Sequence, residues 1–128
     1  MKRIFRTRTF TRWMRKADLT DHSLYKVVSE MLEGLVDGDL GGNLLKKRIG
    51  FPGRGKRGSC RTIVATNRSD RWFFLYGFEK NERSAVTKSE AKALRELARE
   101  YLAFKDQEIE SAVRNGKLME VHNDDNKA

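Results

Sequence analysis

The chain has 128 residues, of which 35% are charged, and its net charge is +9. This length fits one compact domain and excludes two domains of ordinary size. The positive charge favours an anionic partner over a neutral pocket ligand. It is unevenly placed, because residues 1–104 hold 23 Lys and Arg against 12 Asp and Glu, whereas residues 105–128 hold 4 against 6. We predict a basic domain over residues 1–104 and an acidic C-terminal extension over residues 105–128, partly helical and then disordered.

The N-terminal third predicts one short strand and two helices. Residues 2–7 are compatible with a strand, and Thr9 is a candidate cap for a helix over residues 10–17 with a basic outer face. A second helix begins after Thr20 or Asp21 and is expected to end at Gly38. Its periodic apolar positions, expected in the core, are Leu24, Val27, Val28, Met31, Leu32 and Leu35.

The middle of the chain changes to a period of two, which is typical of strands. Over residues 44–49, alternation places Lys46 and Arg48 on one face of the strand and Leu45, Lys47 and Ile49 on the other. Residues 61–66 are rich in β-branched side chains, and residues 71–78 are apolar on both faces. The latter segment is therefore expected to be a central strand covered by helices.

The C-terminal third begins with a capping-box pattern, Thr87 followed by Glu90, which predicts a helix over residues 88–104. Residues 106–115 extend or restart this helix, and residues 118–121 form a short extended piece. The fold class is therefore α+β, with strands joined by short turns into a small antiparallel sheet and the helices on one side of it.

The loop at residues 51–61, FPGRGKRGSCR, contains three glycines, four cations and no acid. Residues 53–58 match the GxGxxG pattern of dinucleotide-binding folds, but that pattern requires a following helix, whereas CRTIVAT favours a strand. Glycines also let a hairpin loop approach a phosphate backbone closely. We therefore interpret the loop as a cationic RNA-binding hairpin, and the candidate RNA contacts around it are Lys46, Lys47, Arg48, Phe51, Arg54, Lys56, Arg57 and Arg61.

The sequence offers few catalytic groups. His22 falls in a predicted helix and His122 in the tail, so they give little support to a catalytic pair, and no metal-ligand cluster is evident. Cys60 is the only cysteine, which excludes an internal disulfide and suits a reducing compartment. We expect no metal, no cofactor and no membrane segment, and a cytoplasmic location. Cleavage of RNA would then rely on cations to stabilise the phosphorane, with a lysine, Glu82 or Tyr76 moving protons.

Three features occur in order along the chain, which are the segment from Gly58 to Val64, a turn with an apolar strand, and the residues GFEKNERS at 77–84. Together they resemble the RelE/HigB group of type II toxin–antitoxin toxins, in particular the HigB-like branch. The resemblance covers residues 1–104. It implies a RelE/ParE-like fold, with two N-terminal helices packed on a small antiparallel sheet and a C-terminal helix. It also implies a metal-independent endoribonuclease that cuts mRNA in the ribosomal A site by attack of the 2′-OH. The implied partners are an antitoxin and, through the antitoxin complex, operator DNA.

The resemblance also implies site residues. Arg61 matches the arginine that contacts the scissile phosphate, and Lys56, Arg57 and Lys80 occupy positions of the catalytic group, with Arg83 as a further RNA contact. Two positions depart from the pattern, because Asn81 replaces an arginine and Thr87 replaces a tyrosine that stacks on a base. Two alternatives remain open at this point, which are a non-catalytic RNA-binding module and a ParE-like toxin directed at gyrase.

Overall fold

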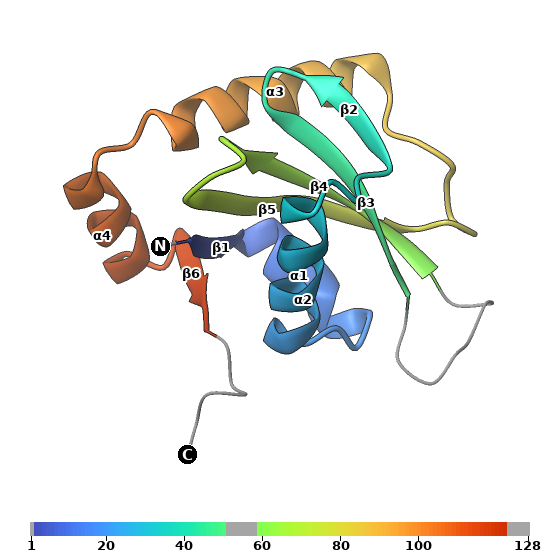
Figure 1. The fold of residues 1–128 in the computed structure, drawn as a ribbon, viewed down its shortest axis with the longest axis horizontal. Helices are drawn as coiled ribbons and strands as arrows, with labels where there is room; N and C mark the ends of the chain where they lie inside the picture. Colours follow the sequence, from blue (N-terminus) through green and yellow to red (C-terminus); the bar gives the residue numbers. More distant parts are fainter. Residues whose placement is uncertain (1, 51–58, 123–128) are drawn as a thin grey trace.

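The computed structural model describes residues 2–50 and 59–122, and its core is one six-stranded sheet with helices on both faces (Figure 1). Within these residues the strands follow the order β2-β3-β4-β5-β1-β6 across the sheet. The elements, in chain order, are β1 (Arg3–Thr7), α1 (Arg8–Lys16), α2 (Asp21–Leu32), β2 (Gly38–Gly41), β3 (Leu44–Gly50), β4 (Ser59–Thr66), β5 (Arg71–Glu79), α3 (Lys88–Leu102), α4 (Asp106–Arg114) and β6 (Leu118–Val121).

The sheet is mostly antiparallel, with one exception between β5 and β1. β2, β3, β4 and β5 pair in sequence as antiparallel neighbours. β1 lies parallel to β5 on one side and antiparallel to β6 on the other. The expectation of a wholly antiparallel sheet was wrong for β1, because the two helices after β1 carry the chain to the far edge of the sheet before β2 begins. The α+β class is confirmed.

The helices cover both faces of the sheet, so the prediction that they gather on one side was wrong. α1 and α2 pack on the face that carries Val64 and Phe74, and α3 and α4 pack on the face that carries Ile63 and Phe73. The physical reason lies in β4 and β5, whose apolar side chains point to both faces and need cover on each. Figure 1 shows α1 and α2 in front of the sheet, α3 crossing the top of the view and α4 at its left.

The N-terminal helices differ in their ends from the sequence prediction. α1 begins at Arg8 because Thr7, and not Thr9, accepts the capping hydrogen bond from the Phe10 N–H. α2 is capped by Thr20, as one of the two predicted residues, but it ends at Leu32. Gly34, with φ +93°, then turns the chain. Leu32 and Leu35 are therefore exposed and not in the core, and Gly38 begins β2, which the sequence did not reveal.

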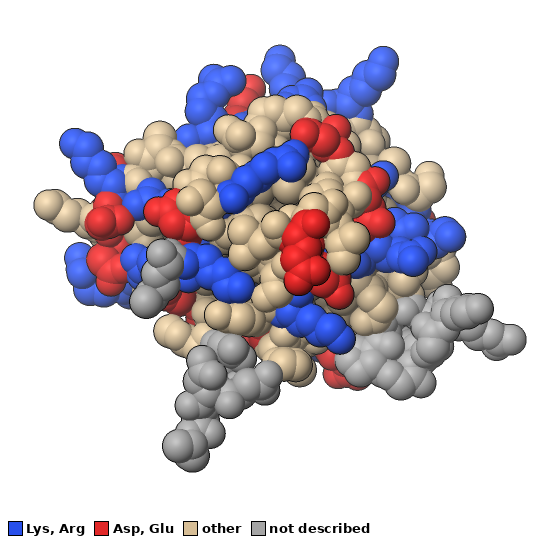
Figure 2. Space-filling view, viewed as in Figure 1, with Lys and Arg blue, Asp and Glu red and all other residues tan. Residues whose placement is uncertain are grey.

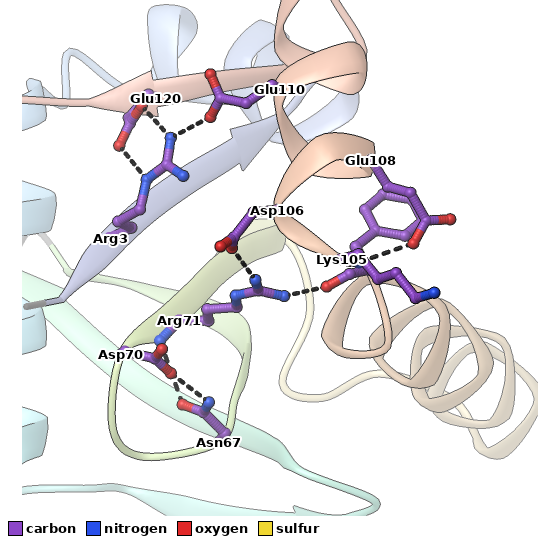
Figure 3. Close-up of polar contacts among 10 residues, drawn as sticks. Arg3, Asn67, Asp70, Arg71, Lys105, Asp106, Glu108, Glu110 and Glu120 are labelled. Carbon is purple, nitrogen blue, oxygen red and sulfur yellow. Dashed lines mark hydrogen bonds and ion pairs between the residues drawn. The ribbon is translucent and has the colours of Figure 1, made fainter.

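The C-terminal segment belongs to the same sheet and core as the rest. α4 begins anew after a break at residues 103–105, and its Ile109 and Ala112 are buried. Arg3 on β1 binds Glu110 and Glu120, each at 2.8 Å, and lowers the pKa of Glu120 (Figure 3). Arg71 binds Asp106 at 2.6 Å and also donates to the Phe104 carbonyl. The domain boundary expected at residues 104–105 thus falls in the short connection between α3 and α4. The sheet and the core both continue beyond this connection.

Candidate nucleic-acid interface

Three cations lie together on the α3 face of the sheet, where β3 ends and β4 begins. Arg48 and Arg61 are direct partners in the β3–β4 register, and Lys46 lies two residues from Arg48 on the same face, as alternation predicted. Arg48 is exposed, and Lys46 and Arg61 are half-buried. Like charges directly opposite each other in a sheet are destabilising, so the paired arginines favour an anion that would neutralise both.

The side chains of this group form no ion pair among the described residues, although the Asp37 carboxylate accepts from the Arg48 backbone N–H at 2.6 Å. The ion pairs between described residues do not include Lys46, Arg48 or Arg61. The one described hydrogen bond of the Arg61 guanidinium is a donation to the Ser59 hydroxyl at 3.5 Å. Figure 2 shows Lys and Arg side chains gathered at the edge of the molecule where Figure 1 places the end of β3 and the start of β4. The arrangement suits a phosphate, whose oxygens accept hydrogen bonds from guanidinium groups.

Lys47 does not join this group. It points to the opposite face, where its side chain is 9% exposed and its Nζ lies 3.1 Å from the Glu30 carboxylate on α2. The sequence predicted the face but not the partner. With its charge neutralised and covered by α2, Lys47 joins β3 to the helix.

Arg83 lies near Arg61, but its donors are engaged. Its Nη1 donates to Glu90 at 2.9 Å and to the Tyr76 hydroxyl at 3.3 Å, its Nη2 donates to Glu90, and its Nε donates to the Ala85 carbonyl. The guanidinium also lies 5.6 Å from the ring centroid of Phe78, and Phe78 is the register partner of Arg61. Arg83 lowers the pKa of Glu90 to about 2, so this pair is ionised at neutral pH.

The connection from β5 to α3 carries the remaining predicted residues. Lys80, Asn81 and Glu82 are exposed in the turn after β5. Thr87 is the N-cap of α3, where its hydroxyl accepts from the Glu90 N–H and the Glu90 carboxylate accepts from the Thr87 N–H. The capping box is confirmed, and it gives Thr87 a structural role at the place where the resemblance would put a tyrosine.

Four predicted residues, Phe51, Arg54, Lys56 and Arg57, lie outside the described residues. The strands on either side of them are described, and Gly50 at the end of β3 pairs with Ser59 at the start of β4. The segment that carries these residues therefore connects Gly50 to Ser59. This pair is two register positions from the pair of Arg48 and Arg61.

The other reactive side chains are unsuited to catalysis at this face. Burial raises the pKa of Cys60 to about 12, so the thiol is protonated at neutral pH. His22 lies on α2 and His122 follows β6, which places them on different elements. Among residues 2–50 and 59–122, no group of three His, Cys, Asp or Glu is placed to hold a metal ion. In the same ranges, no helix is long and apolar enough to cross a membrane.

Comparison with known proteins gives a family for this geometry. The family model described as the RelE toxin of the RelE/RelB toxin–antitoxin system matches residues 2–121, which includes α4 and β6 as well as the strands of the cationic face. No curated protein matches the chain. Because the match covers nearly the whole chain and agrees with the α+β fold, the chain belongs to the RelE toxin family.

Proposed function

We propose that this toxin is a ribosome-dependent mRNA endonuclease that inhibits translation. The observation that carries the proposal is the pair of opposed arginines, Arg48 and Arg61, which lie where β3 ends and β4 begins and form no ion pair with another described residue. Membership of the RelE family supports the nuclease class. The proposed substrate is mRNA in the ribosomal A site, which places the protein in the cytoplasm.

In the proposed reaction, the ribose 2′-OH attacks the adjacent phosphorus, the bond to the 5′ oxygen of the next nucleotide breaks, and a 2′,3′-cyclic phosphate forms. One proton leaves the 2′ oxygen and one reaches the departing 5′ oxygen. Arg61 binds the non-bridging oxygens and stabilises the charge of the phosphorane. We assign Lys56, Arg57 and Lys80 to the same catalytic group, and Lys46, Arg48, Phe51 and Arg54 to binding of the RNA.

Arg83 is better suited to positioning than to phosphate binding, because Glu90 neutralises it and its Nη1 holds the Tyr76 hydroxyl. Tyr76 then becomes the candidate for the aromatic and proton-transfer role that Thr87 cannot fill. Tyr76→Phe removes only the hydroxyl, so we expect a loss of about 10²-fold or more in cleavage rate with unchanged ribosome affinity. An unaltered single-turnover rate would leave proton transfer to the lysines.

The proposed function is tested by mapping mRNA ends after induction in bacteria, with two forms of one reporter message that differ only in the start codon. We expect cuts inside codons of the translated message and none in the message without a start codon. Equal cutting of both forms would show a nuclease independent of the ribosome. Growth arrest without cuts, and with gyrase inhibition, would support a ParE-like toxin instead.

The proposed partners follow from the family. A cognate antitoxin would neutralise the toxin, and the complex of the two would bind operator DNA. The HigB-like branch remains our prediction for the position of this chain within the family, based on the GFEKNERS segment at residues 77–84.

A further inference from the structure

A second group of cations lies along the side of α3 that faces the β2–β3 turn, apart from the strand residues around Arg61. Lys88, Lys92, Arg95 and Arg99 follow one another at intervals of four, three and four residues. This spacing places them on one stripe of the helix, about 16 Å long at 1.5 Å per residue. Figure 2 shows basic side chains projecting from the upper edge of the molecule, where Figure 1 places α3. We call these four residues the α3 stripe.

The α3 stripe is not neutralised within the described part of the chain. The described ion pairs include none of its four members, although Glu96 lies beside them on the helix. Lys88, Lys92 and Arg99 are exposed. The position of these charges on one side of the helix, with no described carboxylate at ion-pair distance, leaves them available to an external anion.

The stripe borders a shallow hollow of about 250 Å³ between α3 and the β2–β3 turn, lined by Gly42, Asn43, Lys92, Arg95, Glu96 and Arg99. Arg95 forms a fixed wall of this hollow, because its Nη1 donates to the Leu40 carbonyl at 3.0 Å. Its side chain packs so closely on Gly42 that a Cβ there would lie 2.9 Å from the Arg95 Cδ. Lys92 and Arg99 lie on either side of Arg95 along the helix, and neither forms an ion pair with a described residue.

The chemistry of the stripe favours a phosphodiester backbone over a protein partner. Its charges recur along a line at steps of about 4.5–6 Å, as a linear polyanion requires. Protein interfaces need an apolar centre, and the exposed large hydrophobic residues of the described chain are Leu32 and Leu35, beyond the end of α2. The stripe thus offers charge without a large exposed hydrophobic residue.

We propose that the α3 stripe is a second RNA-binding site, which holds the backbone of structured RNA through Lys92 and Arg99. Its occupant is ribosomal RNA, and this identification rests on the proposed function. The site would orient the toxin on the ribosome while the face around Arg61 acts on the message. Affinity for the ribosome and cleavage of a bound message would then depend on different residues.

The test compares Lys92→Ala/Arg99→Ala with Arg15→Ala/Lys16→Ala, which removes two exposed charges from α1 on the other side of the sheet. Affinities for programmed ribosomes and for a double-stranded RNA hairpin are measured between about 50 and 200 mM salt. For the α3 variant we expect about tenfold weaker binding. The slope of log K against log salt should also be smaller in magnitude by about 1.5. The α1 variant should match the wild type, and both should cleave message at the wild-type rate when ribosomes are saturating.

Each other outcome has a separate meaning. Normal RNA affinity of the α3 variant, or a loss no greater than that of the α1 variant, overturns the inference while cleavage can still support the proposed function. Weaker hairpin binding by a chain that never cuts message supports the α3 site and removes the proposed nuclease. Loss of antitoxin binding with normal RNA affinity would make the stripe a protein-binding surface, which also overturns the inference.

Discussion

Arg61→Ala is expected to slow cleavage of ribosome-bound message by about 10²–10³-fold, because it removes a preorganised donor from the phosphorane. It should leave folding intact. The only described hydrogen bond of the Arg61 side chain is the 3.5 Å contact with Ser59, and its removal relieves the repulsion from Arg48. The rate is measured in single turnover on programmed ribosomes, and growth arrest after induction should disappear in parallel.

Two further variants separate the chemistry of Arg61 from its charge. Arg61→Lys keeps the charge but loses the planar, two-pronged donor, so its rate should fall between those of the wild type and Arg61→Ala. Arg68→Ala removes an exposed arginine from the β4–β5 turn, where it binds Asp39 at 2.9 Å, and it should cleave normally. A folded Arg61→Ala protein with a wild-type rate would place the site elsewhere.

Gly77→Ala is expected to destabilise the fold by about 2–3 kcal/mol, although Gly77 lies in a regular strand. A Cβ at this position would lie 2.3 Å from Cε3 and Cζ3 of Trp13, so the indole that joins α1 to β5 would have to move. Alanine also lowers the conformational entropy of the unfolded chain, which offsets this loss by less than about 1 kcal/mol. Thermal unfolding should show a decrease of about 10 °C in Tm.

The matched control is Gly38→Ala in β2. A Cβ there would approach only the flexible Lys46 side chain, at 3.2 Å from Cε, so we expect little change in Tm. In a Trp13→Ala background, Gly77→Ala should cost almost nothing, because the clash is gone. Additive losses in the double variant would show that Trp13 is not the cause.

Features decided by local pattern could be predicted from the sequence. Two-sided apolar character identified β5 as a central strand, and the spacing of Thr87 and Glu90 identified the start of α3. β2 was missed because its four residues, GDLG, carry no alternation of apolar and polar side chains. Leu35 was misplaced because helical periodicity continues past Gly34, where the backbone turns.

Contacts between distant residues could not be predicted in the same way. Alternation assigned Lys46, Lys47 and Arg48 to their faces, but only the register of β3 and β4 sets Arg48 opposite Arg61. The ion pairs of Lys47 with Glu30 and of Arg83 with Glu90 depend on how each helix packs. A single sequence contains the residue types of these pairs without stating which ones meet.

The place of β1 in the sheet sets an order of events during synthesis. β1 is made first, yet its two neighbours are β5, which starts at Arg71, and β6, which ends at Val121. A nascent chain therefore carries β1 without a partner until β5 has left the exit tunnel, and with one edge open until β6 follows, since non-local pairs form only when both partners are present. The sheet can therefore close only after Val121 has left the ribosome, so its first strand is also among the last to be fully paired.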